Sequence, residues 1–423
     1  MIIEILCTGD EILTGKTINT NYSHISGRLA EVGLTVRWGT TVGDDRETLM
    51  EALRLAASRA DAVIVNGGLG PTVDDLSQEI AAKAAGVELV LSEEWLARVE
   101  SFYARRNRVM PPNNRKQALL PAGAELIDNP IGTACGFAVT IGKARFFFTP
   151  GVPREMRRML DEQLMPRLLA MSGIKGVTRL KRFHSFGIGE SRADEMLAGT
   201  PGLEEGGAIK LGFQSHYPQL ETKLAVRADD EAAVARVLGP VEVEVRRRLG
   251  NFIIAEDDQR LEGVILDRLT AGGHTLAIAE MVTGGGVAAR IAPQLSAQAV
   301  FRRAIVGRDL AQVFGAVGLD DGFAAAGISE DAAIAVAQGL REVSGASHAL
   351  AVLMELDEGE DRLELGGTIC VGIADPTGAL ARPARLLGGR EWVRMGTIEL
   401  ALDALRRRLL GLEVGERIDF ERR

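Results

Sequence analysis

The chain has 423 residues, 46% of them hydrophobic and 25% charged, which is a globular composition and too long for one ordinary hydrophobic core. Its 49 basic and 58 acidic residues give a net charge of −9, which disfavours nucleic acid as the main partner. The three cysteines lie far apart without metal-binding spacing, which argues against a zinc site, and no apolar run reaches the ~18 residues of a membrane span.

The first third of the chain alternates short apolar runs with helical patterns. Residues 2–7 are apolar without the basic start of a signal peptide, so they predict a buried strand and a cytoplasmic protein. Further strands are expected at 34–42, 62–65 and 146–148, and helices at 21–32, 46–59, 76–85, 93–106 and 154–171. This alternation predicts a mostly parallel sheet covered by helices on both faces. The loops after its strands should share one crevice, where ligands bind in such sheets.

The rest of the chain has a different order of predicted helices and strands. The order strand 178–186, helix 192–197, strands 208–213 and 220–227, and helix 230–249 predicts a small α+β domain. A third α/β unit should follow, with helices at 259–270, 330–343 and 391–410 and strands at 275–279, 349–353, 367–373 and 379–386. We therefore expect three domains, with bounds 1–172, 173–252 and 253–423.

The most informative loop, residues 66–75, follows a predicted buried strand. Its three glycines, which permit close approach of the backbone to a ligand, are Gly67, Gly68 and Gly70. Thr72 or Asp74 can cap the following helix, whose free amides favour a phosphate, and Asp74 and Asp75 offer carboxylates to a divalent cation. A plain glycine turn with an aspartate cap is the alternative. The segment 66–75 is not a Walker loop, because no Gly-Lys-Ser/Thr follows.

Other polar loops follow the remaining strands. Glu11 ends the first of them and can hold a metal or activate a water, although a tight polar turn explains it equally well. After the second strand, one of Asp44 and Asp45 should cap a helix while the other faces the crevice. Residues 129–136 are rich in turn formers that can close over a ligand, and 149–156 precede a helix whose amides can take a phosphate.

Five segments between residues 8 and 191 together resemble the competence/damage-inducible CinA family. They are Thr8-Gly9-Asp10-Glu11, Gly67-Gly68-Leu69-Gly70-Pro71-Thr72-x-Asp74-Asp75, Gly132-Thr133-x-x-Gly136-Phe137, Pro150-Gly151-Val152-Pro153-x-Glu155-Met156 and Gly187-Ile188-Gly189-Glu190-Ser191. The resemblance implies a three-layer molybdopterin-binding (MoaB/MogA-like) domain, a small α+β KH-like domain and a C-terminal α/β CinA-type domain. It also implies a homodimer.

The same resemblance implies an activity for the first domain, the hydrolysis of the pyrophosphate bond of ADP-ribose or a related dinucleotide. The implied cofactor is a divalent metal, Mg²⁺, Mn²⁺ or Co²⁺. Catalytic residues would be Glu11, Asp74 and Asp75, and metal ligands would be Asp44, Asp74 and Asp75. Ligand contacts would be Gly67, Gly68, Gly70, Thr72, Thr133 and, from the second domain, Glu190. The identity of the general base stays open.

The third domain resembles the family's nicotinamide mononucleotide deamidase module but departs from it where the chemistry lies. The family's Ala-Glu-Ser-Cys-Thr-Gly-Gly stands here as Ala279-Glu280-Met281-Val282-Thr283-Gly284-Gly285. Met281 therefore occupies the position of the nucleophilic serine, and a thioether forms no acyl intermediate. The family's glycine-rich loop and tyrosine-containing segment are replaced at 353–359 and 301–304. We predict that the deamidase activity is absent.

Two further functions stay open at this point. One is a non-catalytic nucleotide-binding or regulatory protein, in which both sites have lost their chemistry. The other is molybdopterin binding or adenylyl transfer in cofactor synthesis, because a fold does not fix a function. The intact loop 66–75 and Glu11 argue against the first, and the two extra domains fit the second less well.

Overall fold

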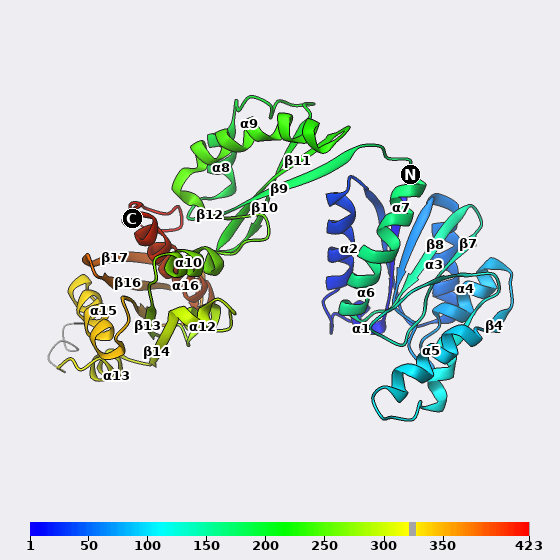
Figure 1. Ribbon diagram of the computed structural model, residues 1–423, viewed down its shortest axis with the longest axis horizontal. Helices are drawn as coiled ribbons and strands as arrows, with labels where there is room; N and C mark the ends of the chain where they lie inside the picture. The colour runs from blue at the N-terminus through cyan, green and yellow to red at the C-terminus, as the bar shows by residue number, and fades with distance from the viewer. Residues whose placement is uncertain (321–326, 423) are drawn as a thin grey trace. The chain divides into compact units, whose positions relative to one another are not determined.

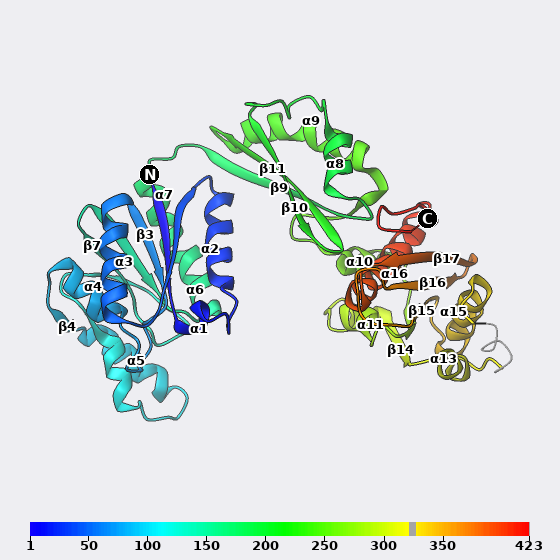
Figure 2. The same cartoon turned by 180° about the vertical axis from the view of Figure 1, so that it is seen from behind.

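The computed structural model describes residues 1–320 and 327–422, and the chain divides into two compact units. The first comprises Met1–Arg179 and Arg227–Glu231, and the second Leu180–Val226 and Ala232–Arg423. Both are mixtures of helices and sheets, as predicted (Figures 1 and 2). Within the described residues, no helix combines the length and the apolar character that crossing a bilayer requires.

The first unit is built on a six-stranded sheet of order β2-β1-β3-β8-β7-β6. Its strands are β1 (Ile3–Thr8), β2 (Val36–Val42), β3 (Ala62–Asn66), β6 (Glu125–Ile127), β7 (Gly136–Ile141) and β8 (Ala144–Thr149). The strands β2, β1, β3 and β8 run parallel, whereas β7 and β6 pair antiparallel at one edge. A separate antiparallel pair is formed by β4 (Leu89–Leu91) and β5 (Leu119–Pro121). The mostly parallel sheet is confirmed, and β7 and β6 are strands that the apolar pattern did not reveal.

Helices cover both faces of this sheet (Figure 1). One face carries α2 (Thr20–Glu31), α6 (Pro153–Met159) and α7 (Met165–Ser172), and the other α3 (Arg46–Arg59), α4 (Ser77–Ala85) and α5 (Glu93–Ala104). Successive side chains of a strand point to opposite faces, so Ile5 packs in the core under α2 and Leu6 in the core under α3. The remaining turns are α1 (Asp10–Leu13), a 3₁₀ helix (Pro112–Ala118) and a π-helical turn (Leu160–Leu164) joining α6 to α7.

The glycine loop meets α4 differently from the prediction. The helix begins at Ser77, and Leu76 before it provides no side-chain cap, so the expected cap by Thr72 or Asp74 is wrong. The Ser77 N–H donates to the Gly68 carbonyl at 3.1 Å, and the Ser77 hydroxyl donates to the Gly67 carbonyl at 2.8 Å. The loop therefore closes on itself through Ser77, and its threonine and aspartates lie outside the helix.

The second unit contains two sheets, of orders β10-β11-β9-β12 and β14-β13-β15-β16-β17. The strands are β9 (Val177–Phe186), β10 (Ile209–His216), β11 (Gln219–Ala228), β12 (Ile253–Glu256), β13 (Leu276–Met281), β14 (Phe301–Gly307), β15 (His348–Leu356), β16 (Gly366–Asp375) and β17 (Gly378–Leu387). The helices are α8 (Glu190–Leu197), α9 (Glu231–Leu249), a 3₁₀ turn (Gly250–Phe252), α10 (Leu261–Ala271), α11 (Gly286–Ile291), α12 (Ala297–Val300), α13 (Leu310–Ala316), α15 (Glu330–Ser344) and α16 (Arg390–Leu410). The predicted β-α-β-β-α order of the small domain is confirmed.

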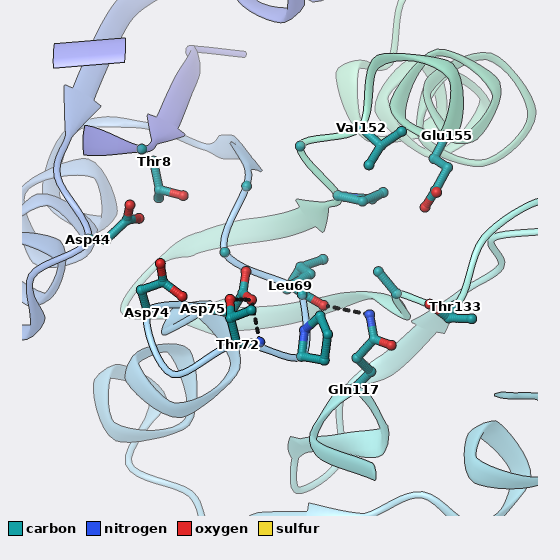
Figure 3. Close-up of a pocket in the computed structure, with 18 of the residues that line it drawn as sticks. Thr8, Asp44, Leu69, Thr72, Asp74, Asp75, Gln117, Thr133, Val152 and Glu155 are labelled. Carbon is teal, nitrogen blue, oxygen red and sulfur yellow. Dashed lines mark hydrogen bonds between the residues drawn. The ribbon is translucent and has the colours of Figure 1, made fainter. Parts of the chain in front are cut away.

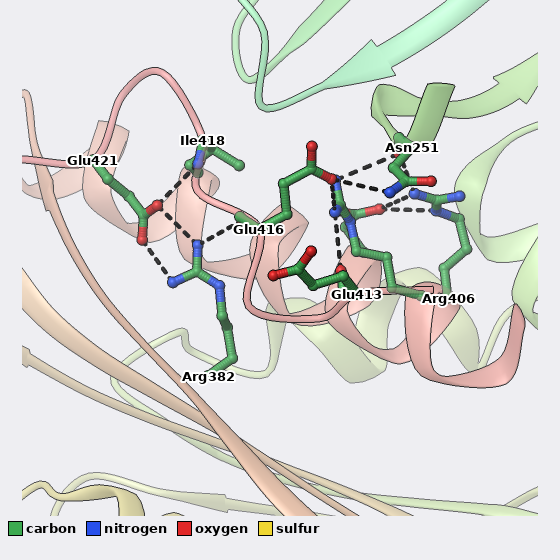
Figure 4. A network of polar contacts seen from close by, with 9 residues as sticks. Asn251, Arg382, Arg406, Glu413, Glu416, Ile418 and Glu421 are labelled. Atoms are coloured by element: carbon green, nitrogen blue, oxygen red, sulfur yellow. Dashed lines mark hydrogen bonds and ion pairs between the residues drawn. The ribbon is translucent and has the colours of Figure 1, made fainter. Parts of the chain in front are cut away.

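Residues 413–422, here called the C-terminal strap, fold back over the second unit (Figure 4). The strap reaches the Gly187–Ser191 motif, where Ile418 fills the space that a Cβ on Gly187 would need. The Asp419 carboxylate accepts the Gly189 N–H at 2.8 Å and pairs with Arg192 at 2.5 Å. The strap thus joins the small α+β domain to the rest of the second unit.

Buried ion pairs fix the other side of the strap. Glu421 pairs with Arg382 of β17 at 2.7 Å, and both side chains are only 6% exposed (Figure 4). Glu416 pairs with Arg407 of α16 at 2.5 Å, and Asp403 also binds that guanidinium at 2.7 Å. The Glu421–Arg382 pair lies out of water, so breaking it is costly, whereas the Glu416 carboxylate is partly exposed.

Candidate functional site

A cleft of about 460 Å³ opens where β1, β2, β3 and β8 end. Its lining includes the predicted carboxylates Glu11, Asp44, Asp74 and Asp75. It also includes Gly67, Gly68, Gly70, Thr72 and Thr133, the predicted ligand contacts of the first unit. The loops after β1 and β3 face the same crevice, as predicted. Figure 3 shows Asp44 and Asp74 on one side of the cleft and Glu155 on the other.

A buried hydrogen-bond network links the strand ends from which the loops of the cleft leave. Asn66, the last residue of β3, donates from Nδ2 to the Pro150 carbonyl at 2.7 Å and to Thr149 Oγ1 at 3.1 Å. Asn21 of α2 donates to Asn66 Oδ1 at 2.9 Å and to the Gly151 carbonyl at 2.7 Å. Because buried amides need partners, this network fixes the positions of the two glycine-containing loops.

Gly67 packs closely against the end of β1. Its φ of +116° is unfavourable for residues with a side chain, and a Cβ there would lie 2.5 Å from Thr8 Oγ1. The loop therefore needs glycine at this position to pack against the end of β1, whether or not a ligand is bound.

The two aspartates after β2 divide their roles as predicted. Asp45 caps α3 by accepting the N–H groups of Glu47 and Thr48, at 3.0 and 2.9 Å. Asp44 lines the cleft, where its Oδ2 accepts the Asp10 N–H at 3.2 Å. Burial raises the pKa of Asp44, and the negative charges of Asp10, Glu11 and Asp74 raise it further. Ionised Asp44 is thus held in the folded protein against an electrostatic cost.

We expect Asp44→Asn to raise the melting temperature of the metal-free protein at neutral pH. The pKa of Asp44 is higher in the folded chain than in the unfolded one, so the ionised carboxylate lowers stability at high pH, and asparagine removes that effect. The gain in melting temperature should disappear as the pH falls below the ordinary aspartate pKa of about 3.9, where Asp44 is protonated in both the folded and the unfolded chain. Thermal denaturation in EDTA between pH 3 and 8 checks this, and an equal gain at every pH would contradict it.

Asp74 and Asp75 occupy different environments in the glycine loop. The Asp75 carboxylate accepts the Thr72 N–H at 2.8 Å as well as the Thr72 hydroxyl (Figure 3). Asp74 is exposed toward the cleft, and the Thr72 hydroxyl and its own backbone N–H lower its pKa. Asp74 is therefore ionised and accessible, whereas Asp75 mainly holds the loop together.

Sequence reasoning missed two side chains that complete the cleft. Glu155, the third residue of α6, points into it and accepts from Asn129 Nδ2 at 2.7 Å. Gln117 donates to the Leu69 carbonyl at 3.2 Å and supports the glycine loop from below. Glu155 belongs to the Pro150–Met156 motif, and its membership in that motif could have indicated a place in the site. Gln117 gave no signal, because it lies in a segment without periodicity.

The cleft is strongly acidic. Five carboxylates line it, those of Glu11, Asp44, Asp74, Asp75 and Glu155, and none of its described lining residues is Arg, Lys or His. No three of the His, Cys, Asp and Glu side chains in the described chain are already grouped to hold a metal ion. Oxygen donors of this kind nevertheless suit Mg²⁺, which proteins hold with one or two carboxylates while substrate phosphates and water complete its coordination. The donor set thus fits a divalent cation that arrives with a phosphate ligand.

Glu190 belongs to the second unit, where it is the exposed first residue of α8. Its motif accommodates the C-terminal strap through Gly187 and Gly189. The ligand contact assigned to Glu190 stays a prediction.

A second cavity, of about 880 Å³, lies at the end of β13 in the second unit. Met281 and Val282 line it, and Val282 has a φ of +68°, an unfavourable conformation for a β-branched residue. The fully buried Glu280 fixes this turn by accepting the Thr283 hydroxyl and the N–H groups of Val287 and Ala288, at 3.0 and 2.9 Å. The side chain at position 281 beside this turn is a thioether, which forms no stable acyl intermediate.

Comparisons with known proteins cover the whole chain. Residues 4–170 match a family model described as "Probable molybdopterin binding domain", residues 180–255 the CinA KH domain and residues 258–409 the CinA C-terminal domain. A CinA-like protein of Geotalea uraniireducens is 38% identical over 429 residues, covering 99% of this chain and 100% of the relative. A CinA-like protein of Geobacter sulfurreducens is 39% identical over 415 residues, covering 97% of this chain and 100% of the relative.

Among solved structures, the protein CinA of unknown function from Thermoplasma acidophilum is 34% identical, with 41% of this chain and 98% of that chain covered and a TM-score of 0.36. The full-length relatives and the three matched domains decide the assignment. The chain belongs to the CinA family, with a molybdopterin-binding-like domain, a KH domain and a CinA C-terminal domain in that order.

Proposed function

We propose that the first unit hydrolyses the pyrophosphate bond of ADP-ribose or a related nucleotide with a divalent cation. The observation that carries the proposal is the meeting of a glycine-rich loop with five carboxylates in one cleft whose described lining has no cationic side chain. A pyrophosphate is itself anionic, so such a cleft favours it only together with a cation. The same acidity argues against binding of the bare nucleotide.

The residues of the cleft have distinct parts in this proposal. The glycine loop offers backbone amides to the phosphates, and Asp44 and Asp74 would hold the cation, with Glu11 beside them. The bound cation supplies charge neutralisation and acidifies water. A carboxylate of the cleft takes the proton as water attacks phosphorus, the bond to the bridging oxygen breaks, and AMP and ribose 5-phosphate leave. Asp75 acts through the Thr72 contacts that shape the loop.

The test is the incubation of the purified chain with ADP-ribose and Mg²⁺, Mn²⁺ or Co²⁺, beside an Asp74→Ala/Asp75→Ala variant. Formation of AMP that is lost in the variant supports the proposal. No turnover with any of the metals, in protein shown to be folded, would sink it. Tight binding of nucleotide or molybdopterin without hydrolysis would instead favour the non-catalytic alternative.

A cytoplasmic location and a homodimer belong to the same proposal. All three cysteines are buried and free, which suits a reducing compartment. Light scattering coupled to size exclusion measures the oligomeric state directly, and a monomer would remove the homodimer from the proposal.

We further propose that the C-terminal domain has no deamidase activity, and the substitution of the nucleophile makes this testable. The purified chain is expected to release no ammonia from nicotinamide mononucleotide, because Met281 has no acyl-accepting atom. Met281→Ser is expected to stay inactive, since the glycine-rich loop and the tyrosine-containing segment are absent as well. Ammonia release by the natural chain at a rate typical of enzymes would show that other groups supply the reaction, and release by Met281→Ser alone would show that the serine was the only missing group.

A further inference from the structure

The side chain of Thr8 is buried at the edge of the cleft without a hydrogen-bond partner. Thr8 is the last residue of β1 and is only 7% exposed. Its Oγ1 is buried, and no group in residues 1–320 or 327–422 pairs with it. It also lines the cleft, and Figure 3 places it beside Asp44 near the glycine loop. Buried hydroxyls without a partner are rare in native proteins and call for an explanation.

Thr149, at the equivalent end of β8, shows what a structural threonine looks like in this sheet. It is fully buried, its Oγ1 donates to the Val65 carbonyl at 3.2 Å, and it accepts from Asn66 at 3.1 Å. Thr8 has a similar burial and the same position at a strand end, yet it makes neither kind of bond. The Thr8 hydroxyl therefore does not stabilise the fold through hydrogen bonds, as the Thr149 hydroxyl does.

Thr8 and Gly67 both line the cleft, and the missing side chain of Gly67 makes room for the Thr8 hydroxyl. Gly67 packs directly against it, and a Cβ at that position would lie 2.5 Å from Oγ1. Two other neutral side-chain donors of the cleft are already engaged, since Thr72 binds Asp75 and Gln117 binds Leu69. Because no described lining residue is cationic, an anionic ligand must find its donors among neutral groups such as the Thr8 hydroxyl.

We propose that Thr8 Oγ donates a hydrogen bond to a phosphate oxygen of the ligand that the glycine loop holds. This inference rests on the proposed function, because it takes the ligand to be a pyrophosphate. It makes Thr8 a substrate-binding residue whose hydroxyl is left unpaired in the free protein so that it can pair with the ligand. A hydrogen bond to a charged phosphate of this kind corresponds to roughly a tenfold to hundredfold change in affinity.

The experiment compares Thr8→Val with Thr8→Ser and Thr149→Val in the full chain. The probe is inorganic pyrophosphate with Mg²⁺, measured by calorimetry, together with the melting temperature of each ligand-free protein. Thr8→Val is expected to weaken pyrophosphate binding about tenfold to hundredfold. Its melting temperature should be unchanged or raised, since valine matches threonine in shape and removes an unpaired hydroxyl. Thr8→Ser should bind as the natural chain does, and Thr149→Val should melt at a lower temperature.

Each other outcome has a distinct meaning. If Thr8→Val binds pyrophosphate as tightly as the natural chain, or melts as low as Thr149→Val, the hydroxyl is structural and the inference is wrong. A Thr8→Val protein that has lost affinity for Mn²⁺ alone would make the hydroxyl a metal ligand and would also overturn it. If the natural chain itself binds no pyrophosphate, AMP or ADP-ribose, the proposed function fails first, and the inference falls with it.

Discussion

Asp74→Asn is expected to lower the rate of ADP-ribose hydrolysis by a factor of about 10²–10⁴, with the fold unchanged. Asp74 is exposed toward the cleft, and its lowered pKa keeps it ionised at neutral pH. Asparagine keeps the size of the side chain but removes the charge that a divalent cation needs. The rate of AMP formation, followed at several metal concentrations, measures the effect.

The metal dependence separates two roles for Asp74. If it holds the cation, Asp74→Asn should need a higher metal concentration for half-maximal rate, whereas a residue that only orients water would leave that concentration unchanged. Asp161→Asn is the matched control, because Asp161 is an exposed aspartate of the first unit that pairs with Arg28 outside the cleft. Its rate should equal that of the natural chain. Full activity of Asp74→Asn would remove Asp74 from the proposed site.

Glu421→Ala is expected to lower the free energy of unfolding of the second unit by about 3–5 kcal/mol. The substitution leaves Arg382 buried and charged with no carboxylate, because both partners of the pair are 6% exposed. The guanidinium would keep the Pro383 and Glu416 carbonyls as acceptors, while its Nε has no partner among the residues of the described chain. Urea denaturation followed by tryptophan fluorescence, with Trp392 as the reporter of the second unit, measures the loss.

Two comparisons make this prediction specific. Glu360→Ala removes a carboxylate from an exposed pair with Arg362, whose side chains are 76% and 70% exposed, and should change stability little. Hydrolysis by the first unit should be the same in Glu421→Ala and in the natural chain, since the cleft belongs to the first unit. An unfolding curve that overlays that of the natural chain would show that the strap contributes little to stability.

The predictable parts of the site were those that depend on neighbours in the sequence. A capping aspartate beside a second aspartate is a local pattern, so the division of roles between Asp45 and Asp44 followed from the sequence. The position of the glycine loop at a strand end also followed, because parallel strands bring their carboxyl ends to one edge. The start of α4 was predicted to within one residue, but its cap was not, since the bonds from Ser77 to Gly67 and Gly68 replace the expected one.

The parts that could not be predicted depend on residues far apart in the chain. Glu155 and Gln117 reach the cleft from segments that only the folded sheet brings together. The lack of a partner for Thr8 is a property of its surroundings, which no sequence pattern encodes. The strap has no periodic pattern, so its glutamates predict only a polar tail. Their pairing with Arg382 and Arg407 is seen only in the folded structure.

The turn at Val282 has a consequence for how such domains are recognised. A left-handed conformation at a β-branched residue is unfavourable by roughly 1–3 kcal/mol, yet it persists here because Glu280 holds the turn from beneath. Glu280 therefore holds the backbone of this turn in place with a thioether side chain at position 281. A comparison of the residue at position 281 alone would therefore miss this turn, whereas a comparison of its backbone conformation and of the Glu280 contacts would find it.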